Sequence, residues 1–117
     1  MSQMDLAAME RAAGKAAGLM RALANEHRLM ILCQLADGER GVGELVQAVG
    51  LSQSAVSQHL ARLRAEGIVA TRRAAQAIYY SLASEEVRRV IDTLYSVYCA
   101  APARCRSTSN PSRRKSA

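Results

Sequence analysis

Three cysteines are the residues of this 117-residue chain whose type most directly suggests chemistry. A thiolate is a nucleophile and a metal ligand, so Cys33, Cys99 and Cys105 are candidates for a reactive site. Because three is an odd number, they do not predict a framework of structural disulfides. A free cysteine is also a small hydrophobe that packs in cores, and this second interpretation stays open here.

A second group of chemically informative residues follows Gly50. The layout is that of a helix-turn-helix: a short helix ends at this glycine, a three-residue turn follows, and Ser52 caps a new helix. The inward stripe of the new helix is Val56, Leu60 and Leu63. Its outward face carries short or forked side chains that suit base edges and phosphates, and we expect His59 to pack or to contact phosphate. The candidate DNA-binding residues here are Ser52, Gln53, Ser54, Ser57, Gln58, His59 and Arg62.

Two β-rich segments, Ile68–Arg73 and Ala77–Leu82, come directly after this helix. Apolar residues alternate with others in the second segment, which predicts a hairpin. The connection from Arg73 to Gln76 would place Arg72, Arg73 and Gln76 at or near the hairpin tip. A basic hairpin after a recognition helix is typical of a wing that contacts the neighbouring minor groove. A plain solvated hairpin is the alternative.

The positive charge of the chain is uneven. Sixteen basic and ten acidic residues give a net charge of +6, but five of the basic residues follow Ala100. Residues 1–100 therefore carry only +1, whereas Ser52–Leu82 holds four arginines and one glutamate. The basic end of the folded body is thus the predicted helix-turn-helix and hairpin, and there we expect the partner to bind.

The remaining elements supply the frame for these residues. We expect helices over Asp5–Leu23, from Asn25 to Asp37, over Val42–Val49 and from Ser84 to Cys99. The predicted fold is mainly α with a small β-hairpin, a winged helix-turn-helix in the order α-α-α-α-β-β-α. The last helix has a wide apolar face, which predicts a C2 dimer that presents two recognition helices to a palindromic site. We expect residues 1–100 to form one domain and residues 101–117 a basic, disordered tail.

Several function classes are disfavoured. The longest aliphatic run, Leu29–Cys33, is too short to span a membrane, and no secretory signal precedes it, so we expect a cytoplasmic protein. No nucleophile–base constellation, phosphate-binding loop or metal cluster is visible, which argues against an enzyme and against a cofactor or metal. A protein-interaction module without DNA binding is the alternative from another class, and the polar outer face of the predicted recognition helix argues against it.

The order of elements, with the segments Leu23–Leu32 and Leu51–Leu60 and the strand Ile78-Tyr79-Tyr80, resembles the ArsR/SmtB family of winged-helix repressors. The resemblance covers about residues 10–99. It implies a homodimer that binds double-stranded operator DNA and releases it when an inducer alters the dimer. Metal-sensing members carry a Cys-x-Cys at the start of the third helix or Asp/His ligands along the last helix, and this chain has neither.

The pair Cys33 and Cys99, with its flanks and the wing around Arg72–Ala77, resembles the sulfide- or persulfide-responsive BigR/SqrR-like branch of that family. The resemblance implies that reactive sulfur species link the two thiols through inserted sulfur atoms and so relieve repression. A peroxide sensor that forms a simple disulfide, or a metal or metalloid sensor, is the alternative. Cys105 matches nothing in the family, and its role, like the operator and the target genes, stays open.

Overall fold

Polar side chains begin the helices at the positions where the sequence predicts them. The computed structural model describes residues 4–99, so the expected tail at 101–117 lies outside the described residues. The N–H of Arg28 donates to Asn25 Oδ1 at 3.0 Å, and the N–H groups of Ala55 and Val87 donate to Ser52 Oγ and Ser84 Oγ at 3.1 Å each. The helices are α1 (Leu6–Leu23), α2 (Glu26–Asp37), α3 (Val42–Val49), α4 (Gln53–Ala65) and α5 (Glu85–Tyr98).

A left-handed glycine separates α3 from α4. Gly50 has φ 74° and ψ 27°, which is the conformation that glycine adopts most readily at a helix C-terminus. Its N–H donates to the carbonyl of Val46, so the chain leaves α3 sharply and re-enters a helix at Ser52. The helix-turn-helix expected from the sequence is therefore confirmed.

The sheet has three strands, one more than the sequence predicts. β2 (Val69–Ala74) and β3 (Ala77–Leu82) form the expected antiparallel hairpin, called the wing below. The short β1 (Arg40–Gly41) pairs with the other edge of β3, and the order is β1-β3-β2. The predicted order α-α-α-α-β-β-α is thus incomplete, because two residues are too few to show an alternating pattern.

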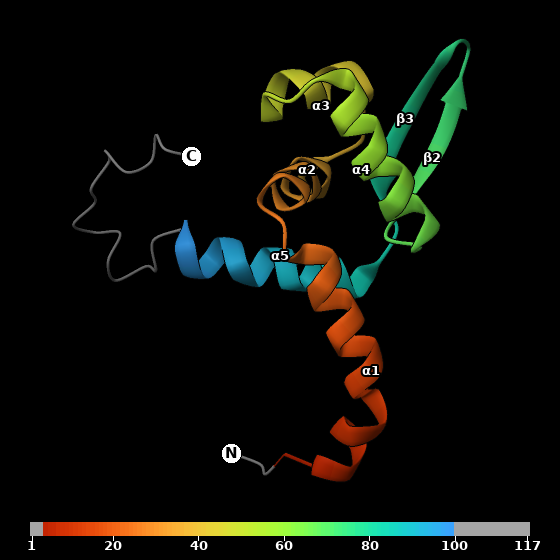
Figure 1. The fold of residues 1–117 in the computed structure, drawn as a ribbon. Coiled ribbons are helices and arrows are strands. Elements are labelled where there is room, and N and C mark those ends of the chain that lie inside the picture. Colours follow the sequence, from red (N-terminus) through yellow and green to blue (C-terminus); the bar gives the residue numbers. More distant parts are fainter. Residues whose placement is uncertain (1–3, 100–117) are drawn as a thin grey trace, which may run out of the picture.

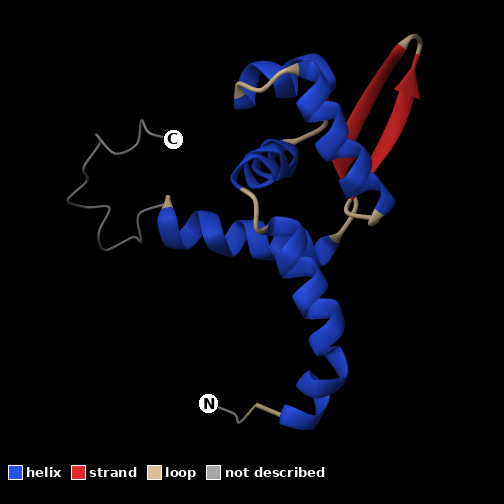
Figure 2. Ribbon diagram, in the orientation of Figure 1, coloured by secondary structure: helices blue, strands red, loops and turns tan. Residues whose placement is uncertain are grey.

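The wing turn is tighter than the predicted connection. Arg73 and Ala74 belong to β2, and the turn consists of Ala75 and Gln76, of which Ala75 has φ 57°. Gln76 is therefore at the tip, as predicted, whereas Arg72 and Arg73 lie in the strand below it. Figures 1 and 2 show the wing rising beside α4 and beyond the helices.

The core is centred on α2, as its apolar sequence predicts. Ile31, Leu32 and Leu35 of this helix are buried. They pack with the inward stripe of α4 and with buried residues from α3, β2 and α5, which are Leu45, Val69, Val87 and Ile91. Burial of such side chains contributes about 1.5–3 kcal/mol each, so the inward stripe of α4 fixes this helix on the core.

Two helices leave apolar side chains uncovered in the single chain. α1 projects away from the body (Figure 1), and Leu6 and Met20 on it are 74% and 67% exposed. Only Val87 and Ile91 of the predicted apolar face of α5 are buried, while Val97 and Tyr98 are exposed. Much of the apolar face that the sequence predicts for α5 is therefore uncovered in the single chain. None of the helices among residues 4–99 combines the length and the apolarity that crossing a membrane requires.

Candidate nucleic-acid interface and thiol pair

The outer face of α4 presents the polar residues that the sequence predicts to contact DNA. One stripe of this helix is fully buried, namely Val56, Leu60 and Leu63, so the opposite face points outward. The exposed residues on that face and its margins are Gln53, Ser54, Ser57, Gln58 and Arg62. Ser52 is exposed too, but its hydroxyl already accepts the capping hydrogen bond from Ala55. These amides and hydroxyls can donate hydrogen bonds to base edges and accept hydrogen bonds from them.

His59 lies on the flank of α4 that faces the start of α2. Its side chain is half-buried, and burial is the main reason why the pKa of the imidazole is lowered; the nearby charges of Arg28, His27 and Arg62 lower it further. At this position the role predicted for His59, packing or a contact with phosphate, stays a prediction. Arg62 is exposed, with its Nε 3.7 Å from Glu66 Oε2.

Arg28 is a structural residue that sequence reasoning missed. Its Nε donates to the carbonyl of Ala22 at 2.9 Å, and its Nη2 donates to the carbonyl of Arg21 at 3.3 Å. Arginine near a helix C-terminus satisfies carbonyls that have no partner within the helix. Arg28 thereby fixes the corner between α1 and α2, next to the flank of α4 that carries His59.

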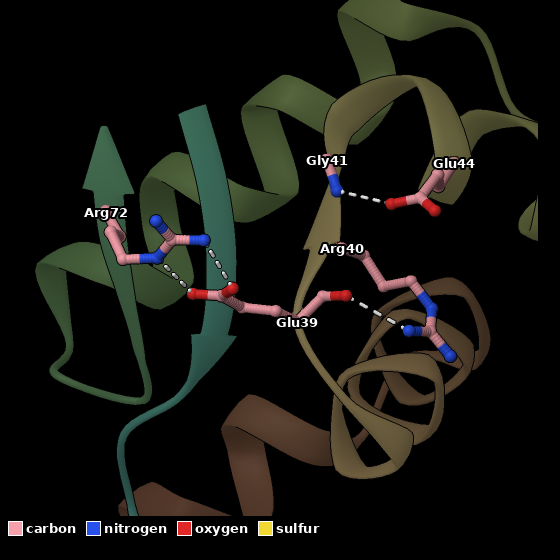
Figure 3. Close-up of polar contacts among 5 residues, drawn as sticks. All are labelled: Glu39, Arg40, Gly41, Glu44 and Arg72. Atoms are coloured by element: carbon pink, nitrogen blue, oxygen red, sulfur yellow. Dashed lines mark hydrogen bonds and ion pairs between the residues drawn. The ribbon is translucent and has the colours of Figure 1, made fainter. Parts of the chain in front are cut away.

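The two arginines of the wing have different environments. The Nε and Nη2 atoms of Arg72 donate to the two carboxylate oxygens of Glu39 at 2.9 and 2.8 Å, and its guanidinium lies 5.0 Å from the centre of the Tyr79 ring. Figure 3 shows this bidentate pair. Arg73 is exposed, and in the described part of the chain no carboxylate lies within ion-pair distance of it. Glu39 and Tyr79 are the partners that sequence reasoning missed, because the pair joins residues far apart in the chain.

Cys33 and Cys99 lie on neighbouring helices. α2 and α5 are in contact, and Cys33 is half-buried against the core while Cys99 is exposed at the C-terminal cap of α5. Burial raises the pKa of the Cys33 thiol, and the charge of Cys99 raises this pKa further. Both cysteines are free thiols. Cys105 lies outside the described residues.

Metal ligands are not assembled around these thiols. Within residues 4–99, no three side chains of His, Cys, Asp or Glu form a group that would hold a metal ion. The pair Cys33 and Cys99 therefore supplies two sulfur atoms and no further ligands of these types from the described residues.

Comparisons with known proteins agree with this geometry. Residues 25–71 match the family described as "Bacterial regulatory protein, arsR family". Over 98 residues, the chain is 52% identical to the transcriptional activator HlyU of Vibrio cholerae. This match covers 84% of the present chain and 91% of HlyU. The structure of reduced HlyU from Vibrio cholerae superposes with a TM-score of 0.75 at 52% identity, covering 79% of this chain and 97% of that one.

Two other solved structures are similar. The transcriptional repressor BigR from Xylella fastidiosa superposes with a TM-score of 0.78 at 40% identity, and the match covers 84% of this chain and 100% of that one. A homodimeric winged helix-turn-helix DNA-binding domain from Mycobacterium bovis superposes with a TM-score of 0.66 at 35% identity. The match covers 82% of the present chain and 87% of that domain. With this identity, this coverage and this winged helix-turn-helix, the chain belongs to the arsR family of DNA-binding transcriptional regulators and is not an enzyme.

Proposed function

We propose that the chain is a homodimeric repressor that binds a palindromic operator and leaves it when reactive sulfur species link Cys33 to Cys99. The observation that supports the proposal is that α2, which holds Cys33, contacts α5, which ends at Cys99. The charge of Cys99 also adds to burial in raising the pKa of the Cys33 thiol. A link between the two thiols would tie α5 to α2, whose buried residues share one core with those of α4. Such a link would favour one arrangement of the recognition helices over another.

The DNA contacts of the proposal come from two elements. Gln53, Ser54, Ser57 and Gln58 of α4 would meet base edges in the major groove, and the wing would follow the minor groove with Arg73 and Gln76. Their exposure on α4 and on the wing supports these roles. Repression is the direction that we infer, since the similar BigR is described as a repressor, although the similar HlyU is described as an activator. In vitro transcription from a bound promoter should therefore fall when the protein is added.

The dimer of the proposal would use the apolar side chains that one chain leaves exposed. Leu6 and Met20 of α1 and Val97 and Tyr98 of α5 are between 65% and 78% exposed. Large apolar side chains that a single chain leaves exposed on its terminal helices offer a surface for a second subunit. The similar domain from Mycobacterium bovis is described as homodimeric, which supports the same assembly here.

Val97→Asp should dissociate the dimer. A charge placed in an apolar interface costs desolvation energy without a partner, so we expect a loss of about 2 kcal/mol or more in dimer stability. Sedimentation equilibrium measures the change. The matched control is Ser96→Asp, which adds the same charge to the neighbouring exposed residue on a different side of α5. A Val97→Asp protein as dimeric as the wild type would exclude this face as the interface.

The sulfur chemistry needs two thiols and a persulfide, R–S–S–H, as the oxidant. The exposed Cys99 attacks the outer sulfur of a persulfide, gains one sulfur atom and releases R–S⁻. A second persulfide extends this chain by one sulfur in the same way. The thiolate of Cys33 then attacks the middle sulfur and expels HS⁻, which leaves a trisulfide. In total, two thiols and two persulfides give one trisulfide, two R–SH and one H₂S, so atoms and electrons balance.

Intact-mass spectrometry of the treated protein tests this chemistry. Persulfide should add one or more sulfur atoms and remove two hydrogens, whereas a simple disulfide removes two hydrogens only. Peroxide treatment and metal addition are run in parallel, because they correspond to the two alternative inducers. Linkage by peroxide alone, or a bound ion that releases operator DNA, would replace the persulfide proposal.

The reactivity of Cys33 should depend on Cys99. Burial raises the pKa of the Cys33 thiol and the charge of Cys99 raises it further, so Cys99→Ser should lower the pH at which the Cys33 thiolate forms. The measurement is the rate of alkylation of the Cys33 peptide by iodoacetamide as a function of pH. The midpoint should shift to lower pH in Cys99→Ser and stay in place in Cys105→Ser. Identical midpoints in all three proteins would show that the two thiols are too distant to interact.

A further inference from the structure

We propose that Glu39 is a positioning residue for the wing: it holds Arg72 across the outer face of the sheet, so that Arg72 sets the wing angle and Arg73 is left to contact phosphate. We call Glu39, Arg72 and Tyr79 the wing clamp. The inference rests on the proposed function in one respect, namely that the wing contacts DNA. It changes the role of Arg72 from the phosphate contact that the sequence suggests to a link within the protein.

The wing clamp spans the whole sheet. Glu39 directly precedes β1, Tyr79 lies in the central strand β3 and Arg72 lies in the far strand β2. Gly41, Tyr79 and Arg72 are paired in one row across the three strands. The guanidinium of Arg72 therefore lies over the Tyr79 ring, 5.0 Å from its centre, and reaches Glu39 at the other edge. Figure 3 shows the pair of Arg72 and Glu39. One side chain thus links the two edges of the sheet.

The loop that presents Glu39 is itself held in place. Arg40 Nη1 donates to the carbonyl of Glu39 at 3.0 Å, and Arg40 Nη2 lies 3.3 Å from Asp37 Oδ2 at the end of α2. The N–H of Gly41 donates to Glu44 Oε1 at 2.9 Å, which joins β1 to the first turn of α3. Glu39 is therefore tied to the helices that carry the recognition helix, and through Arg72 the wing is tied to them as well.

Strand alternation separates the two arginines. Val69, Thr71 and Arg73 share one face of β2, and Val69 on that face is buried in the core. Arg72 points to the opposite face, where Tyr79 and Glu39 lie. Arg73 therefore sits on the face of the wing that is turned toward the helices, near the tip. A single strand cannot direct both side chains to the same phosphate.

Binding of phosphate by Arg72 would be costly. Its Nε and Nη2 already make two charge-assisted hydrogen bonds, which are stronger than neutral ones. Releasing them would leave the carboxylate of Glu39 facing DNA. The hydrogen bonds from Arg72 lower the pKa of Glu39, so the carboxylate is ionised at neutral pH and the wing clamp is closed there. Because a lowered pKa favours the charged form, the clamp opens only when the pH falls through that lowered value.

The wing clamp matters for orientation more than for stability. Both partners are partly exposed, and exposed ion pairs contribute little to the free energy of unfolding. A two-stranded hairpin by itself is only marginally stable in water, and β1 adds just two residues to it. Substitutions in the wing clamp should therefore leave the protein folded but allow the wing to change its angle to the helices. A residue that packed in the core would instead destabilise the fold when substituted.

The test is operator binding of the full-length protein at several salt concentrations. We expect Glu39→Gln and Arg72→Gln each to weaken binding about 3- to 10-fold, and the double variant to be no weaker than either single one. The slope of log K against log[salt] should stay unchanged in all three. Arg73→Gln should instead reduce that slope by about 1.8, because each of the two wings of the proposed dimer loses one phosphate contact.

Arg72→Lys separates the two roles of the arginine. Lysine keeps the charge but lacks the planar fork, so this variant should behave like Arg72→Gln if the role is positioning. If Arg72→Lys binds like the wild type while Arg72→Gln loses salt slope, or if Glu39→Gln binds more tightly, Arg72 is a phosphate contact and the proposal is wrong. A separate result, in which Arg73→Gln leaves both affinity and slope unchanged, would instead refute the proposed contact between wing and DNA.

Discussion

Replacing Cys33 or Cys99 with serine should abolish the response of operator binding to persulfide while leaving the affinity of the untreated protein unchanged. In the wild type, we expect linkage to lower operator affinity at least tenfold, which corresponds to about 1.4 kcal/mol. In either variant one sulfur is missing, so no covalent bridge forms between α2 and α5. The ratio of operator affinity before and after persulfide treatment should therefore stay near one. Fluorescence anisotropy with a labelled operator measures both states.

Serine is a suitable replacement at both positions for different reasons. Cys99 is exposed, so the hydroxyl of serine is hydrated there as the thiol was. Cys33 is half-buried against the core, so Cys33→Ala is added as a second variant that avoids placing a hydroxyl there. The matched control is Cys105→Ser, which should respond like the wild type. A normal response in Cys33→Ser and Cys33→Ala, or a lost response in Cys105→Ser, would show that another thiol is the sensor.

Gln58→Ala should weaken binding to the operator by about 1–3 kcal/mol and leave binding to unrelated DNA nearly unchanged. Gln58 is exposed on the outer face of α4, and its amide both donates and accepts hydrogen bonds. Its loss would remove discrimination between bases but no phosphate charge. The readout is the ratio of specific to non-specific affinity at one salt concentration. Ser57→Ala should lower the same ratio, since its hydroxyl lies on the same helix and is exposed too.

Gln47 offers a matched control for this prediction. It is an exposed glutamine as well, but it lies on α3, the first helix of the helix-turn-helix. Gln47→Ala removes the same chemical group from a helix that does not enter the groove in this architecture, so the affinity ratio should stay as in the wild type. If Gln58→Ala lowered specific and non-specific affinity equally, Gln58 would contact the backbone and not a base.

The helices of this protein follow from short-range patterns in the sequence. The side-chain oxygens of Asn25, Ser52 and Ser84 cap the helices at the predicted positions, and Gly50 ends α3 in the left-handed conformation. Each of these signals acts within four residues, so it is visible without the fold. For the same reason, the buried stripe of α4 predicted the outward direction of the polar residues that form the candidate DNA interface.

The wing depends in part on contacts that such short-range patterns do not predict. The strand Ala77–Leu82 alternates and was predicted with its exact bounds, but Arg40–Gly41 is a strand only because it pairs with Tyr79 and Tyr80. Equally, the basic residues near the hairpin tip are visible in the sequence, whereas the partner of Arg72 is not. From the sequence, Arg72 has no visible partner, whereas in the structure it is paired with Glu39. This difference changes the role that we propose for Arg72.

By itself, the sequence determined which segments are helical, which face of the recognition helix is polar and which residues are thiols, since these properties depend on residue type and on neighbours along the chain. Tertiary structure alone decided that α2 and α5, the helices of Cys33 and Cys99, are in contact, that Glu39 binds Arg72 and that α1 and α5 keep apolar side chains exposed. The physical reason is that these contacts join segments distant in sequence. They form only when burial of the core around α2 brings those segments together.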